Sequence, residues 1–92
     1  MYQIELSKQF QRSRKKAIKR GFDVKELDDV VMTLASGEKL DPKYRDHQLQ
    51  GEYKAFRECH VKPDWLLVYR IFRKKCYLYL FDTGTHADIF GK

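Results

Sequence analysis

The stretch Phe56–Tyr69, which reads FRECHVKPDWLLVY, decides the fold of this chain of 92 residues. An alternating segment ends at His60, the pair Pro63 and Asp64 forms a turn, and a nearly unbroken apolar segment begins at Trp65. Alternation of polar and apolar residues is typical of a half-buried strand, and a continuous apolar run is typical of a central strand. We therefore expect a β-hairpin at the centre of a sheet.

Two more strands are predicted outside this hairpin. Residues 2–6 are rich in strand formers, and residues 76–82 (CYLYLFD) follow a short basic turn. With hairpin strands at residues 52–60 and 65–72, and two helices after the first strand, the element order is β-α-α-β-β-β. Strands joined by short turns run in opposite directions. The sequence predicts a single α+β domain over residues 1–92, with a largely antiparallel four-stranded sheet covered by a two-helix hairpin.

The two helices are recognised by their ends. Ser7 and Asp23 stand where an N-cap side chain accepts hydrogen bonds from the free amides of the first turn. Gly21 and Gly37 stand where a residue with positive φ ends a helix. Because only Gly21 and Phe22 join the helices, we expect antiparallel neighbours that cover one face of the sheet.

The first helix is strongly basic. Residues 8–20 include seven basic and no acidic side chains, while Phe10, Ala17 and Ile18 share one face. Two interpretations stay open: a solvated helix surface, or a surface that follows phosphates or binds an acidic partner. Over the whole chain, 19 basic and 13 acidic residues give a net charge of +6. This excess favours anionic partners, such as nucleic acid, an acidic protein or a ribosome surface.

Other features of the composition predict a cytoplasmic protein without membrane association. The longest apolar run, Trp65–Tyr69, is too short to cross a bilayer, and residues 1–6 do not look like a signal peptide. The two cysteines, Cys59 and Cys76, lack the spacing of metal ligands and are expected to be reduced thiols. We expect no metal site and no cofactor.

Strand direction gathers three titratable residues at one end of the predicted sheet. His60 ends the second strand, Asp64 precedes the third, and His86 follows the fourth. Two histidines and a carboxylate can cleave a phosphodiester by acid–base catalysis: a base deprotonates the 2′-hydroxyl and an acid protonates the leaving 5′-oxygen. Each residue taken alone also fits an ordinary turn or surface position. Simple topology places the third histidine, His47, at the far end of the sheet.

Three motifs together carry a resemblance to a known family: DHQLQG at residues 46–51, FRECHVKPDWLLVY at 56–69 and GTHADIFG at 84–91. Their order and spacing resemble the YafQ-type toxins of the RelE/ParE superfamily of bacterial toxin–antitoxin systems. The resemblance implies a RelE-like fold and a metal-independent endoribonuclease that cuts mRNA in the A site of the 70S ribosome. It also implies a small acidic antitoxin of the DinJ or RelB type, whose complex with the toxin binds operator DNA and represses the shared operon.

Carried over position by position, the resemblance assigns His47, His60, Asp64 and His86 to catalysis and Phe90 to RNA binding. His47 then belongs to the site, so the loop that carries it has to fold back across the sheet. We expect His86 to be the general acid. His60 with Asp64, or else His47, would serve the 2′-hydroxyl.

Three cations, Lys54, Arg57 and Arg70, are the expected contacts to phosphate, although alternation suggests that they do not all face one way. Asp82 stands where some relatives of the family carry arginine, and a carboxylate there would weaken phosphate attraction. Two alternatives therefore remain. One is a weakened toxin that acts mainly through its antitoxin complex, and the other is a ParE-like gyrase poison, although such relatives generally lack the histidine cluster.

Overall fold

The computed structural model describes residues 1–91, in which three helices and two short 3-10 turns accompany a five-stranded sheet. The strands are β1 (Gln3–Leu6), β2 (His47–Gln48), β3 (Arg57–Lys62), β4 (Trp65–Phe72) and β5 (Tyr77–Gly84). The helices are α1 (Lys8–Lys19), α2 (Val24–Ala35) and α3 (His86–Phe90), and the 3-10 turns are η1 (Pro42–Tyr44) and η2 (Gly51–Tyr53). Within residues 1–91, no helix combines the length and apolar character that a membrane span needs.

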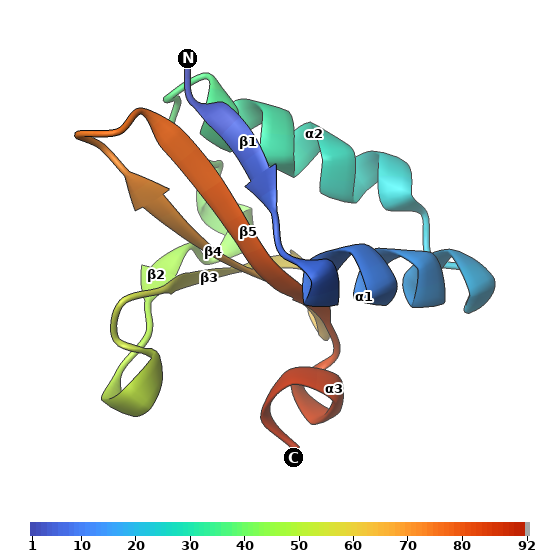
Figure 1. Cartoon of the computed structure of the whole chain (residues 1–92). Coiled ribbons are helices and arrows are strands. Elements are labelled where there is room, and N and C mark those ends of the chain that lie inside the picture. The colour runs from blue at the N-terminus through green and yellow to red at the C-terminus, as the bar shows by residue number, and fades with distance from the viewer. Residues whose placement is uncertain (92) are drawn as a thin grey trace.

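The strand order is β1-β5-β4-β3-β2, with β1 parallel to β5 and all other neighbours antiparallel (Figure 1). The β3–β4 hairpin lies inside the sheet, where Cys59 is opposite Leu67, so the predicted hairpin is confirmed. The α+β fold is also confirmed, but the sheet has five strands instead of four. The additional strand, β2, has two residues, too few for any alternation to be visible in the sequence.

Two segments predicted as strand or open turn are helical instead. β3 begins at Arg57, five residues later than predicted, because residues 51–53 form η2. The tail after β5 forms α3. The Thr85 side chain accepts a hydrogen bond from the amide of Asp88, and the Asp88 carboxylate accepts one from the amide of Thr85. This reciprocal capping explains why so short a helix begins there.

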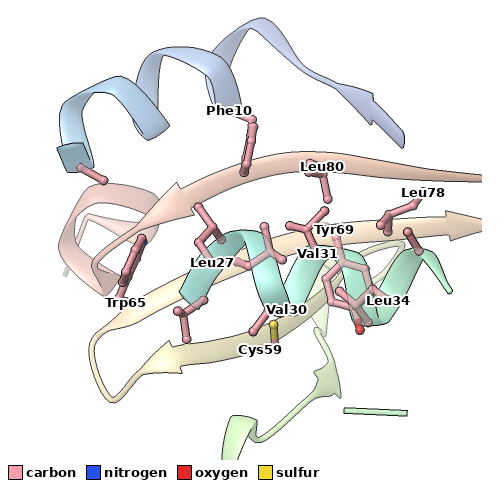
Figure 2. Packing of buried hydrophobic residues seen from close by; sticks show 14 residues of the cluster. Phe10, Leu27, Val30, Val31, Leu34, Cys59, Trp65, Tyr69, Leu78 and Leu80 are labelled. Carbon is pink, nitrogen blue, oxygen red and sulfur yellow. The ribbon is translucent and has the colours of Figure 1, made fainter. Parts of the chain in front are cut away.

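The core lies between α2 and one face of the sheet. The buried side chains Leu27, Val30, Val31 and Leu34 of α2 pack against those of β3, β4 and β5 (Figure 2). Asp23 caps α2 by accepting from the amide of Lys25, as its position in the sequence predicted. The apolar spacing of α2 and its capped start together direct this face of the helix onto the sheet.

The basic helix α1 contributes a narrower apolar stripe. Ser7 caps it as predicted, and Phe10 and Ala17 are buried in the same core. The expectation for Ile18 is wrong, because its side chain is 48% exposed. Successive helical residues point about 100° apart, so a helix that contacts the sheet along a thin stripe leaves the neighbour of Ala17 in solvent.

Asp82 ties α1 to β5. Its carboxylate is buried and accepts hydrogen bonds from Gln9 Nε2 at 2.7 Å and from Ser13 Oγ at 2.6 Å. The amide of Thr83 donates to the same carboxylate at 2.8 Å. A carboxylate that is surrounded by donors of its own chain has a structural role, which the sequence had not suggested for Asp82.

Replacing Asp82 with alanine is expected to lower the free energy of unfolding by about 2 kcal/mol, since two side chains of α1 and the buried amide of Thr83 would lose a charged acceptor. Urea unfolding followed by circular dichroism measures this loss. Asp29→Ala, at an exposed position of α2, is the matched control and should change stability by less than about 0.5 kcal/mol. Equal midpoints for the two variants would contradict a structural role for Asp82.

Candidate active site

The side of the sheet turned away from α2, which we call the histidine face, carries the candidate site. Cys59 and Leu67 belong to the core under α2. Side chains alternate along a strand, so Glu58 and His60 of β3 lie on the opposite face. The strand register places them beside Val68 and Leu66 of β4.

Three histidines meet on this face. The ring centroids of His47 and His60 are 6.1 Å apart, and those of His60 and His86 are 5.7 Å apart. The topology-based position of His47 at the far end of the sheet is therefore wrong. β2 pairs antiparallel with β3 and sets His47 directly opposite Glu58, so the loop does fold back.

A residue that the sequence reasoning missed, Glu58, joins two of these histidines. Its Oε2 atom lies 3.1 Å from His47 Nε2 and 3.4 Å from His60 Nε2, and the side chain is 6% exposed. The signal was present in the sequence: an acidic residue two positions before His60 in an alternating strand shares its face. A buried carboxylate requires partners, and here the partners are imidazoles.

The other ring nitrogens restrict the protonation of this cluster. His47 Nδ1 lies 2.7 Å from the carbonyl oxygen of Arg45, and His60 Nδ1 lies 3.2 Å from that of Pro63. A carbonyl oxygen only accepts hydrogen bonds, so each Nδ1 carries a hydrogen. His47 Nε2 and His60 Nε2 both contact Glu58 Oε2, and both contacts are hydrogen bonds only when two protons lie between these three atoms. When only one proton lies there, one Nε2 keeps a lone pair that can accept a second proton.

His86 is paired separately with Asp64. Its Nδ1 lies 2.5 Å from Asp64 Oδ1, and its backbone amide donates to the same oxygen at 3.0 Å. These two hydrogen bonds lower the pKa of the Asp64 carboxyl, with the backbone amide as the larger cause. The expected pairing of His60 with Asp64 is corrected, because the carboxylate next to His60 is Glu58.

The helix that begins at His86 is held in place by α1. Arg20 Nη1 donates to Asp88 Oδ2 at 2.7 Å, and Lys16 Nζ lies 4.0 Å from the other oxygen of this carboxylate. The hydrogen bond from Arg20 and the one from the Thr85 amide hold the pKa of Asp88 well below its ordinary value. These contacts of Asp88 hold the short helix α3 next to the C-terminal end of α1.

Arg57, expected at the phosphate, lies on the other face of the sheet. Its Nε and Nη2 atoms donate to Asp46 at 3.3 and 3.2 Å, and the hydroxyl of Tyr69, a core residue, donates to the same carboxylate. Burial, and the hydrogen bond to Asp46, raise the pKa of Tyr69. The structure therefore does not bring Arg57 together with the histidines. Its contact anchors Asp46, the residue directly before His47.

The remaining three predicted RNA contacts lie on different parts of the fold. Phe90, at the end of α3, packs edge-on against Tyr53, with ring centroids 5.4 Å apart. Lys54 follows η2 and is exposed, while its carbonyl oxygen accepts from Gln48 Nε2 at 2.6 Å. Arg70 lies on the histidine face further along β4, where its guanidinium covers the ring of Phe72 at 4.3 Å. A helix, a turn and a strand supply these three residues, so their positions could not be derived from sequence spacing.

The same cluster could also hold a metal ion. One ligand atom each from His47, Glu58 and His60 lies within 4.8 Å of the others, which among residues 1–91 is a set of donors suited to an ion. Imidazole and carboxylate ligands suit zinc or copper, and three ligands would leave an open position. Because β2 and β3 bring these residues together, their sequence spacing had indicated no metal site. A bound ion would take the place of the shared protons.

Comparison with known proteins shows the family to which the chain belongs. Residues 2–91 match the family model of the bacterial toxin of type II toxin–antitoxin systems, YafQ. The mRNA interferase toxin YafQ of Escherichia coli K12 is 41% identical over 90 residues, which cover 96% of this chain and 95% of that protein.

Solved structures of similar toxins also match the chain in sequence and in fold. A structure of the E. coli DinJ–YafQ complex contains a chain 38% identical, with a TM-score of 0.90 and coverage of 99% of this chain and 100% of that one. A metal-bound toxin from Helicobacter pylori is 49% identical, with a TM-score of 0.92 and coverage of 98% and 100%. The chain, with its fold and its histidine face, belongs to the YafQ family of bacterial type II toxins.

Proposed function

We propose that this toxin is an mRNA interferase, an endoribonuclease that cuts mRNA in the ribosomal A site by metal-independent acid–base catalysis. The observation that carries the proposal is the presence of two separate proton-handling groups on one face. One is the cluster of His47, Glu58 and His60, and the other is the pair of His86 and Asp64. The name of the E. coli relative, an mRNA interferase toxin, supports the same reaction.

His86 serves as the general acid. Asp64 accepts from Nδ1 and stabilises the imidazolium, which leaves Nε2 to give its proton to the departing 5′-oxygen. The backbone hydrogen bond from His86 to the same carboxylate fixes the direction of the ring. Phe90, one turn further along α3, would stack on a neighbouring base.

The cluster around Glu58 serves as the base. With one shared proton, one Nε2 has a lone pair that accepts the proton of the 2′-hydroxyl, and the adjacent carboxylate of Glu58 stabilises the imidazolium that forms. His47 is the accessible member, since its side chain is 49% exposed and that of His60 is 13% exposed. The 2′-oxygen attacks phosphorus as the 5′-oxygen leaves, which yields a 2′,3′-cyclic phosphate and a 5′-hydroxyl. The positive charge gained by the cluster, together with Lys54, offsets the charge of the phosphorane.

A transition-metal ion in this cluster would supply Lewis-acid chemistry. It would also occupy the ring nitrogens that have to exchange protons in the proposed mechanism. A chelator selective for zinc and copper, which leaves the magnesium of the ribosome in place, is therefore expected not to reduce cleavage.

The partners follow from charge and from the family. The exposed cations of α1 suit the phosphates of a ribosome surface, in a cytoplasmic protein with no membrane contact. The DinJ–YafQ complex supports a small acidic antitoxin of the DinJ type as the neutralising partner. Operator DNA would be bound only through that complex.

Induction of the chain in growing bacteria is expected to stop growth and to remove intact mRNA, without DNA damage. Northern blots, together with a reporter of DNA breaks, measure the two effects in one culture. DNA damage with intact mRNA would favour the gyrase poison instead. Normal growth combined with tight binding of the antitoxin would favour a weakened toxin that acts through its complex.

A further inference from the structure

Far from the histidines, three side chains form a stack at the tip of the β4–β5 hairpin. The rings of Phe72 and Tyr77 are 4.5 Å apart with an angle of 18° between their planes. The guanidinium of Arg70 lies 4.3 Å from the centre of the Phe72 ring. Arg70 is exposed and the two rings are half exposed. We call these three residues the tip stack.

The tip stack lies on the histidine face. Along β4, residues 66, 68, 70 and 72 point to one side, and Leu66 is directly opposite His60 of β3. The six residue steps from Leu66 to Phe72 span about 20 Å at about 3.3 Å per step. Figure 1 shows the turn between β4 and β5 at the opposite end of β5 from α3, which carries His86. An extended RNA strand of a few nucleotides would reach from the histidines to the tip stack.

The part of the β4–β5 hairpin that surrounds the tip stack carries positive charge. Residues 65–81 contain four basic and no acidic residues, and Asp82 lies near the other end of β5. These cations are Arg70, Arg73, Lys74 and Lys75, and within residues 1–91 none of them forms an ion pair. With Ile71 and Phe72 they line a shallow hollow of about 410 Å³. The strand register places the acidic residue Glu5 beside Tyr79, so one strand separates it from Arg70.

Flat rings, a stacked guanidinium and unpaired cations together fit single-stranded nucleic acid. A base can stack on an aromatic ring or on an arginine plane, while neighbouring cations contact its phosphates. An acidic peptide would need the cations but not the stacked rings. We propose that the tip stack is a second RNA contact, which holds a base of the strand being cut a few nucleotides from the scissile phosphate. The inference rests on the proposed function and adds a binding subsite to it.

The test compares RNA binding by two variants in a His86→Ala background, so that the probe stays intact. The double variant Phe72→Leu and Tyr77→Leu removes the rings but keeps apolar side chains at both positions. Tyr44→Leu, which alters an aromatic residue packed on the core under α2, is the matched control. A fluorescent single-stranded RNA and fluorescence anisotropy give Kd, and thermal melting confirms that each variant is folded.

We expect the double variant to bind about 10- to 100-fold more weakly than the control, the range for loss of base stacking. The slope of log Kd against log salt should stay the same, because no cation is removed. A probe of equal length whose bases are removed near one end should bind both variants alike. Equal affinity of the variants for intact RNA, or the same loss with the abasic probe, would overturn the inference.

Two further results separate the possible failures. Weaker binding of the antitoxin with unchanged RNA affinity would assign the tip stack to the antitoxin and overturn the RNA contact. If the unaltered chain cleaves RNA while the double variant still binds it normally, the inference fails and the proposed function stands. If the unaltered chain cleaves no RNA on ribosomes, the proposed function is wrong. The cleavage assay alone decides this, independently of the RNA-binding measurements.

Discussion

Replacement of His86 by alanine is expected to lower the rate of mRNA cleavage by about 10²- to 10⁴-fold, the usual contribution of a general acid. The imidazole is paired with Asp64 through Nδ1, so its other nitrogen is the group that would protonate the leaving 5′-oxygen. Cleavage of ribosome-bound mRNA, followed by primer extension, measures the effect. Growth arrest on induction should disappear with the activity.

The structure supplies controls for this variant. Asp64→Asn should cause a smaller loss, because the imidazole remains but its imidazolium loses a stabilising charge and a fixed direction. Binding of the antitoxin and the urea midpoint should not change in either variant, since both side chains are exposed at the rim. Full activity of the His86→Ala variant would show that His86 is not the general acid.

Replacement of Glu58 by glutamine is expected to lower the cleavage rate by about 10²- to 10³-fold, although the side chain contacts no substrate in the proposed mechanism. The amide keeps the size of the carboxylate but removes the negative charge shared by His47 and His60. A neutral amide cannot stabilise the positive charge that the cluster gains in the proposed reaction.

The loss in Glu58→Gln should appear in kcat with little change in KM, because Glu58 contacts no substrate in the proposed mechanism. Glu52→Gln, an exposed change in η2, is the matched control and should leave both constants unchanged. A kcat equal to that of the unaltered chain would show that the cluster does not handle protons in the reaction.

Much of the fold could be predicted from residues that act locally. Ser7, Asp23 and the Phe56–Tyr69 hairpin behave as their chemistry requires, because caps, turns and alternation depend on neighbours in sequence. The failure at Ile18 has a different origin. How wide an apolar stripe a helix buries depends on the surface it meets, which the helix sequence does not contain.

The site was predicted less completely, for physical reasons. Strand direction alone placed His60, Asp64 and His86 at one rim, and the structure brings them together there. His47 depends on a two-residue strand that is formed by pairing, not by propensity. Glu58 shares the face of His60, but its role needs both histidines, and the position of His47 was not available from topology. The family resemblance supplied His47 and did not supply Glu58.

The central claim is that the 2′-hydroxyl of the RNA is the nucleophile and that the histidines move its proton. The most direct measurement uses ribosomes programmed with an mRNA in which a single 2′-deoxynucleotide replaces the nucleotide at the cleavage site. We predict cleavage of the all-ribose mRNA to a 2′,3′-cyclic phosphate and a 5′-hydroxyl, and no cleavage at the substituted position. Cleavage at the deoxynucleotide, or products with a 5′-phosphate, would contradict the account.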